Sequence, residues 1–171
     1  MNSATLGIAA DFVKTGIEKA GIPLSATLEA YLSLTFARFI GGSINVDLLT
    51  IRVAQALDAG APRGVIRGLA DECLIACAFF ERRLRRSGTV RHYVGLGQTS
   101  YDAARLTEQA YGFVHMRDVM ASAAATDEEH EDARVLVDRA RAGSQTARNE
   151  LAVQNVVVGP WGNGRPGLLW R

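Results

Sequence analysis

The chain has 171 residues, of which 48% are hydrophobic and 22% are charged, and its 19 lysines and arginines nearly balance its 18 aspartates and glutamates. A chain of this length is typical of one domain, which buries enough apolar surface to fold without a disulfide or a structural metal. The apolar fraction is too high for a disordered chain, and a net charge of +1 provides no overall field that would attract nucleic acid or a membrane.

Hydrophobic residues recur at helical spacing between the glycine- and proline-rich turns, and no sustained alternation of apolar and polar residues predicts a strand. Ser3 and Ser25 are suitable N-caps, and Pro62 suits the first turn of a helix. The expected helices span approximately residues 3–20, 25–39, 47–57, 62–86, 99–124 (or 101–124), 127–142 and 144–154. We therefore predict an all-α, single-domain bundle of six or seven helices over residues 1–158, followed by a Gly/Pro/Trp-containing C-terminal tail at 159–171.

The two cysteines, Cys73 and Cys77, are one helical turn apart in an apolar stripe. The stripe consists of Ile66, Leu69, Cys73, Cys77, Phe80 and Leu84. This pattern indicates buried, inert thiols. The alternative, a redox or metal-binding pair, lacks both a Cys-x-x-Cys motif and a second pair of ligands, so no metal or cofactor is expected.

The sequence shows no pattern typical of a signal peptide or of a membrane-spanning helix. No basic region precedes an apolar run at the N-terminus, and every apolar run is broken well before the ~20 residues that a membrane-spanning helix needs. We expect a cytoplasmic protein without a membrane span.

Several short motifs follow one another over about residues 25–155. They are Leu69-Ala-Asp71 leading through Phe79-Phe80 to Glu81-Arg82-Arg83, Tyr93-Val-Gly-Leu-Gly97 with Ser100-Tyr101, Phe113, Asp118-Val-Met, and Ala-Gly-Ser144 leading to Leu151-Ala. In these the chain resembles a family of uncharacterised bacterial all-helical cytoplasmic proteins of unknown function. The resemblance implies a compact helical domain and carries over no catalytic residue, and the tail with its two tryptophans departs from the family's shorter ending.

Positive charge is concentrated in residues 81–92, where five arginines and one glutamate give +4. The arginines are Arg82, Arg83, Arg85, Arg86 and Arg91. Guanidinium groups pair with phosphates and carboxylates, so the segment could contact nucleic acid or an acidic protein, or it could be a solvated helix end.

Negative charge is concentrated in residues 127–132, where five carboxylates occur in six positions. This run could pair within the chain, contact a second copy or remain solvated. It lacks the ligand spacing and the glycine of a calcium loop.

A possible pocket consists of Tyr101, Glu108, Tyr111 and His115, whose intervals of 7, 3 and 4 residues predict one helix face. These groups could be structural, or they could perform acid–base chemistry with a partner from another helix. In the preceding segment, 95–100, we expect the glycines to allow close helix packing or a kink, with Thr99 or Ser100 capping the next helix.

The tail carries both tryptophans, Trp161 and Trp170, and could fold back on the bundle or dock onto another protein. No complete catalytic motif is present, so the sequence favours a non-catalytic protein that acts through protein–protein contacts, with a partner or as a homo-oligomer. The arginine-rich segment and the tail are its candidate surfaces. The alternatives are an enzyme or ligand-binding protein that uses the possible pocket, and a nucleic-acid-binding protein that uses the arginines.

Overall fold

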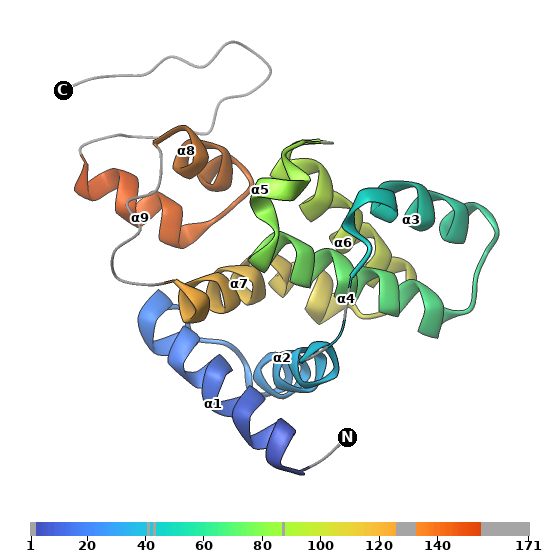
Figure 1. Ribbon diagram of the computed structural model, residues 1–171, viewed down its shortest axis with the longest axis horizontal. Coiled ribbons are helices and arrows are strands. Elements are labelled where there is room, and N and C mark those ends of the chain that lie inside the picture. The colour runs from blue at the N-terminus through green and yellow to red at the C-terminus, as the bar shows by residue number, and fades with distance from the viewer. Residues whose placement is uncertain (1–2, 41, 43, 87, 126–132, 155–171) are drawn as a thin grey trace.

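The computed structural model describes residues 3–40, 42, 44–86, 88–125 and 133–154, and the structural statements below concern these residues. Within them the chain forms nine α-helices and one 3₁₀ helix, with no strand (Figure 1). The elements are α1 (Ser3–Ala20), α2 (Ala26–Phe39), η1 (Val46–Leu48), α3 (Leu49–Asp58), α4 (Arg63–Phe79), α5 (Glu81–Leu84), α6 (Val90–Ala103), α7 (Thr107–Ala124), α8 (Ala133–Arg141) and α9 (Gln145–Val153). The all-α prediction is confirmed, and the predicted count of six or seven helices is wrong.

The predicted cap Ser25 is confirmed, and Ser144, predicted only as the first residue of the last helix, also serves as an N-cap. The hydroxyl group of Ser25 accepts a hydrogen bond from the backbone N–H of Leu28, and that of Ser144 accepts one from the N–H of Ala147. Each bond satisfies one of the amide groups that the first turn of a helix leaves without an internal partner.

The extra helices come from two breaks that the sequence analysis missed. The helix predicted over 62–86 ends at Phe79, and α5 begins two residues later, so Phe80 leaves the apolar stripe and becomes exposed. The segment 95–100, where close helix packing or a kink was predicted before the cap of a new helix, lies inside α6. The N-cap of α6 is Thr89 rather than Thr99 or Ser100, and α6 ends before Arg105, which adopts a φ of 63°.

Helix α7 is central to the packing, because it contacts α1, α4 and α6. A Cβ atom on Gly16 of α1 would lie within 3.0 Å of the backbone oxygen of Val119, and one on Gly97 of α6 would lie as close to the ring of Phe113. The absence of side chains at these glycines therefore permits the close approach of both helices to α7. At Gly97 this confirms the close packing predicted from the sequence.

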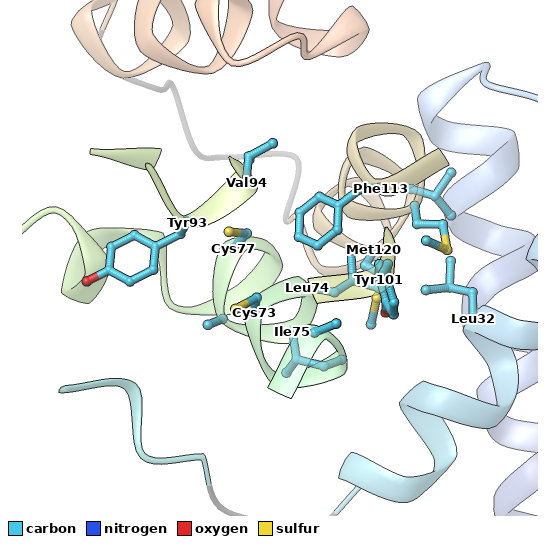
Figure 2. Close-up of a cluster of buried hydrophobic side chains, with 14 of the residues drawn as sticks. Leu32, Cys73, Leu74, Ile75, Cys77, Tyr93, Val94, Tyr101, Phe113 and Met120 are labelled. Atoms are coloured by element: carbon cyan, nitrogen blue, oxygen red, sulfur yellow. The ribbon is translucent and has the colours of Figure 1, made fainter. Parts of the chain in front are cut away.

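All of the helices from α1 through α7, together with η1, contribute buried side chains to one hydrophobic core. Figure 2 shows part of it, with side chains contributed by α2, α4, α6 and α7. The labelled residues are Leu32, Cys73, Leu74, Ile75, Cys77, Tyr93, Val94, Tyr101, Phe113 and Met120. Beside this core, three phenylalanine rings connect α1, α2 and α4, with centroid separations of 4.3 Å for Phe12–Phe36 and 5.7 Å for Phe36–Phe79.

Helices α8 and α9 lie side by side and share a smaller apolar cluster (Figure 1). Its buried residues are Leu136, Ala140, Ala147 and Leu151. The helix predicted over 127–142 is present as α8 from Ala133, whereas its first residues, the acidic run and the proposed boundary at 158 lie outside the described residues.

Candidate functional site

The arginine-rich segment covers α5, the turn after it and the first turn of α6, and two of its members are paired within the molecule. Arg83 donates two hydrogen bonds to the Asp47 carboxylate, including one of 2.9 Å from Nε to Oδ1. These bonds, together with the charges of Arg83 and Arg86, hold the pKa of Asp47 below its usual value. Arg85 donates to Glu81 at 2.7 Å and to Asp138 at 2.9 Å, which ties α5 to α8.

The other three arginines, Arg82, Arg86 and Arg91, are exposed and form no side-chain hydrogen bond or ion pair within the described part of the chain. We call these three residues the arginine surface. The predicted cluster of five is therefore divided: Arg83 and Arg85 hold neighbouring elements together, and the arginine surface is exposed to solvent.

Arg91 of the arginine surface also lines an open groove of about 490 Å³ on the outer face of α6. Its lining is Thr89, Arg91, His92, Gly95, Leu96 and Thr99. A Cβ atom on Gly95 would have no atom within 4 Å, so the missing side chain leaves open space between the turns on either side.

Two exposed apolar residues lie on elements that contact this region. Leu48 is 48% exposed and Ile51 is 54% exposed. Leu48 follows Asp47, the partner of Arg83, and Ile51 follows Thr50, whose hydroxyl oxygen is 3.1 Å from Nε2 of His92 in the groove. Basic and apolar side chains are thus exposed on neighbouring segments.

The predicted pocket residues do not come together. Tyr101 is completely buried at the end of α6, whereas Glu108, Tyr111 and His115 lie on α7 and are exposed, Tyr111 by 84%. Glu108 accepts a hydrogen bond of 2.5 Å from the hydroxyl group of Ser25. The prediction of a single helix face is wrong because α6 ends at Ala103 and the chain turns before α7 begins at Thr107. Tyr101 and the other three residues therefore lie on different helices.

Sequence reasoning missed a buried carboxylate, Asp71 of α4, which is 1% exposed and accepts hydrogen bonds from side chains of α2 and α6. Tyr31 of α2 and Tyr101 of α6 donate to its Oδ1 at 2.6 and 2.8 Å. Arg38 donates to Oδ2 at 3.2 Å, and Nε of Arg67 lies 3.8 Å from the same oxygen. We call these five residues the Asp71 centre.

Burial controls the ionisation of the Asp71 centre. It raises the pKa of the Asp71 carboxyl, while hydrogen bonds from Tyr31 and Tyr101, and then the two arginines, oppose the shift. Burial and the Asp71 charge raise the pKa of Tyr31 to about 12 and that of Tyr101 well above its ordinary value. Both phenols therefore remain protonated at neutral pH and act as donors to Asp71.

One local signal could have revealed this centre. Asp71 lies between Ala70 and the buried Cys73 in the apolar part of α4, and Arg67 precedes it by one turn. A carboxylate on a buried stripe requires donors, because an unpaired buried charge is costly. Local spacing does not identify donors that come from α2 and α6.

A second buried pair joins α7 to α9. Arg117 and Asp118 are both completely buried, with Nε of Arg117 3.1 Å from Oδ1 of Asp118. The other oxygen of Asp118 accepts hydrogen bonds of 2.9 Å from the Ser144 hydroxyl and from the backbone N–H of Gln145. Since both bonds come from the start of α9, Asp118 fixes where that helix begins.

Cys73 and Cys77 are free and buried, as predicted. Burial raises the pKa of both thiols, that of Cys77 to about 12. Low thiolate content and burial make both groups poor nucleophiles.

The remaining observations concern metals, membranes and the tail. No group of three or more His, Cys, Asp or Glu residues suited to a metal ion occurs within the described ranges. In the same part of the chain, no helix has the length and apolar character needed to cross a membrane. Trp161 and Trp170 lie outside the described residues.

Comparison of the chain with protein-family models, curated proteins and solved structures finds no match in any of the three. The resemblance to a bacterial helical family therefore stays an expectation.

Proposed function

We propose that the chain is a single-domain helical bundle that acts in the cytoplasm by binding an acidic protein, without catalysing a reaction. The observation that carries this proposal is the arginine surface, where Arg82, Arg86 and Arg91 are exposed and form no ion pair within the described residues, with Arg91 lining the α6 groove. Unpaired exposed charges increase the association rate and the specificity of binding more than they stabilise the protein that carries them.

The neighbouring apolar residues support a protein as the partner. Arginine is enriched at protein interfaces, and exposed apolar side chains such as Leu48 and Ile51 gain free energy when a partner covers them. Nucleic acid is a weaker fit, because Asp47 and Glu81 neutralise the adjacent arginines and interrupt a continuous positive surface.

The single-domain part of the proposal rests on links between the two apolar clusters. Arg85 connects α5 to Asp138 of α8, and Asp118 of α7 holds the start of α9. The cytoplasmic part rests on two free thiols, which fit a reducing compartment.

Catalysis in the predicted pocket has lost its support, because the side chains of Tyr101 and the three α7 residues do not converge. The titratable groups that are buried together, at Asp71 and at Arg117–Asp118, bond mainly to one another. They support the fold in the way expected of structural polar groups.

Photo-crosslinking in the source cells tests the proposal. A photoreactive phenylalanine analogue replaces Gly95, where a side chain meets no other atom and points into the groove region. We expect discrete protein adducts that resist nuclease. Replacing Arg82, Arg86 and Arg91 with Gln should lower their yield about 10- to 100-fold, since each exposed charge contributes up to ~1 kcal/mol.

A matched control replaces Arg63, Arg105 and Arg141 with Gln, which removes three exposed positive charges from other positions. This control should leave the adducts unchanged. Adducts of equal yield in both triple variants, or adducts that nuclease destroys, would contradict the proposed surface.

The tail is a second proposed contact, because Trp161 and Trp170 are of a residue type enriched at binding hot spots. Deletion of residues 159–171 should change the oligomeric state measured by light scattering or the set of crosslinked adducts. If neither changes, the tail has no role in binding.

A further inference from the structure

The Asp71 centre carries more positive charge than its carboxylate requires. Arg38 of α2 and Arg67 of α4 approach the same oxygen, Oδ2 of Asp71, at 3.2 and 3.8 Å. Two guanidinium groups thus share one carboxylate. Their side chains are 43% and 37% exposed, whereas Asp71 is 1% exposed, so the excess charge faces solvent.

The neighbouring ion pair shows that one arginine is enough for an acid on α4. Arg52 donates to both oxygens of Glu72 at 2.6 and 2.8 Å, which uses both of its terminal nitrogens. Asp71 already accepts two phenolic hydrogen bonds in addition to the one from Arg38. Charge balance alone therefore does not explain why Arg67 is also present.

Three terminal nitrogens of the two arginines have no partner in the described part of the chain. Arg38 uses Nε on the Leu34 carbonyl and Nη1 on Asp71, which leaves Nη2. Arg67 uses Nε on the Tyr31 hydroxyl group, which leaves Nη1 and Nη2. These nitrogens are strong donors, and guanidinium groups match the geometry of phosphate and carboxylate oxygens.

Both guanidinium groups are held in place before any ligand binds. The guanidinium carbon of Arg67 lies 5.0 Å from the centre of the Tyr31 ring, and Tyr31 is itself anchored by Asp71. Arg38 is fixed by bonds to Leu34 and Asp71. Pre-ordered side chains lose less conformational entropy when they bind.

Helix α4 provides an additional positive charge on the same face. Arg63, Arg67 and Asp71 are spaced by four residues each, and Arg63 is exposed without an ion pair in the described residues. The local surplus therefore suits a dianion better than a monoanion.

We infer that Arg38 and Arg67 together bind a phosphate group at the α2–α4 surface above Asp71. The ligand chemistry is a phosphate monoester or inorganic phosphate, and Asp71 acts as the positioning residue for the two arginines.

Titration of the full-length protein with inorganic phosphate, at constant ionic strength maintained with chloride, tests this site. We expect saturable shifts of the guanidinium NMR signals of Arg38 and Arg67, with a dissociation constant on the order of 1 mM or below. Arg38→Gln should weaken binding at least about tenfold, because one of the two charged donors is lost. Arg38 is substantially exposed, so this variant is expected to fold, which circular dichroism verifies.

Two controls separate this site from other positive charges. Arg52→Gln removes a similarly exposed arginine on the neighbouring ion pair and should leave phosphate binding unchanged. The triple Gln variant of Arg82, Arg86 and Arg91 should also bind phosphate normally, so failure of the proposed protein interface would not affect this result.

The source of the phosphate is distinguished by comparing inorganic phosphate with phosphoserine and with a phosphoserine peptide. Tighter binding of the peptide assigns the site to a phosphorylated protein, whereas equal binding assigns it to a free phosphate compound. The inference is overturned if phosphate produces no saturable shift in the wild-type protein, or if Arg38→Gln binds as tightly as the Arg52→Gln control.

Discussion

The structure predicts that Tyr101→Phe destabilises the protein through the loss of a single hydroxyl group. Tyr101 is completely buried, and its hydroxyl donates to Oδ1 of Asp71 at 2.8 Å. The substitution keeps the ring and its contact with Phe113, at a centroid separation of 6.0 Å, so packing changes little. What is lost is one of the donors that compensate for the burial of Asp71.

The expected magnitude follows from the type of hydrogen bond. A bond to a charged acceptor contributes about 1.5–3 kcal/mol to stability. For a protein of this size, each kcal/mol lowers the melting temperature by roughly 2–4 °C, so a decrease of roughly 3–12 °C is expected. The stability difference between the wild type and Tyr101→Phe should become smaller in acid, because protonation of Asp71 replaces a charged acceptor by a neutral one.

Urea unfolding monitored by circular dichroism, with wild-type and variant m-values compared, measures this difference. Tyr111→Phe is the matched control, since Tyr111 is 84% exposed, and its substitution should change stability by less than about 0.5 kcal/mol. Equal stabilities of Tyr101→Phe and Tyr111→Phe would refute the conclusion that Asp71 depends on buried donors.

Three other predictions concern packing, thiols and pH. Gly16→Ala should lower the free energy of unfolding, measured in a urea titration, by about 1–3 kcal/mol, because the new methyl group meets the backbone of α7. Gly68→Ala, with open space around it, should raise the free energy of unfolding by about 0.5–1 kcal/mol. An equal effect of the two substitutions would contradict the packing described. Cys73 and Cys77 should react with a thiol reagent only on unfolding, and rapid labelling of the native protein would show that they are accessible. Because folding raises the pKa of Tyr31 from 10.0 to about 12, its contribution to stability is complete below pH 10 and is lost as the pH rises to about 12. Unfolding free energies measured over this range should therefore fall less in Tyr31→Phe than in the wild type, and equal slopes would contradict the raised pKa.

Features that depend on local spacing were predictable from the sequence. Ser25 was recognised as a cap because cap preference is a property of one residue and the turn that follows it. The burial of Cys73 and Cys77 followed from the apolar residues one turn away on either side.

The missed features depend on tertiary contacts. No glycine or proline marks the break after Phe79 or the turn at Arg105, which takes a left-handed conformation that is uncommon for a residue with a side chain. Segment 95–100 was expected to allow close helix packing or a kink before a new helix, and it instead continues α6, where the ring of Phe113 occupies the space that a side chain at Gly97 would fill.

The candidate site was only partly predictable for the same reason. The sequence shows five clustered arginines, but not that Arg83 meets Asp47 and Arg85 meets Asp138, since these partners are distant in the chain. The Asp71 centre likewise assembles residues of α2, α4 and α6 that no local pattern connects.

Hydrogen–deuterium exchange of the free protein and of the complex crosslinked through position 95 tests the proposed interface most directly. The proposal predicts slower exchange in the complex over residues 81–99, which carry the arginine surface and the groove, and over the neighbouring residues 47–51. Unchanged exchange in these segments, or protection confined to α8 and α9, would contradict a partner bound at the arginine surface.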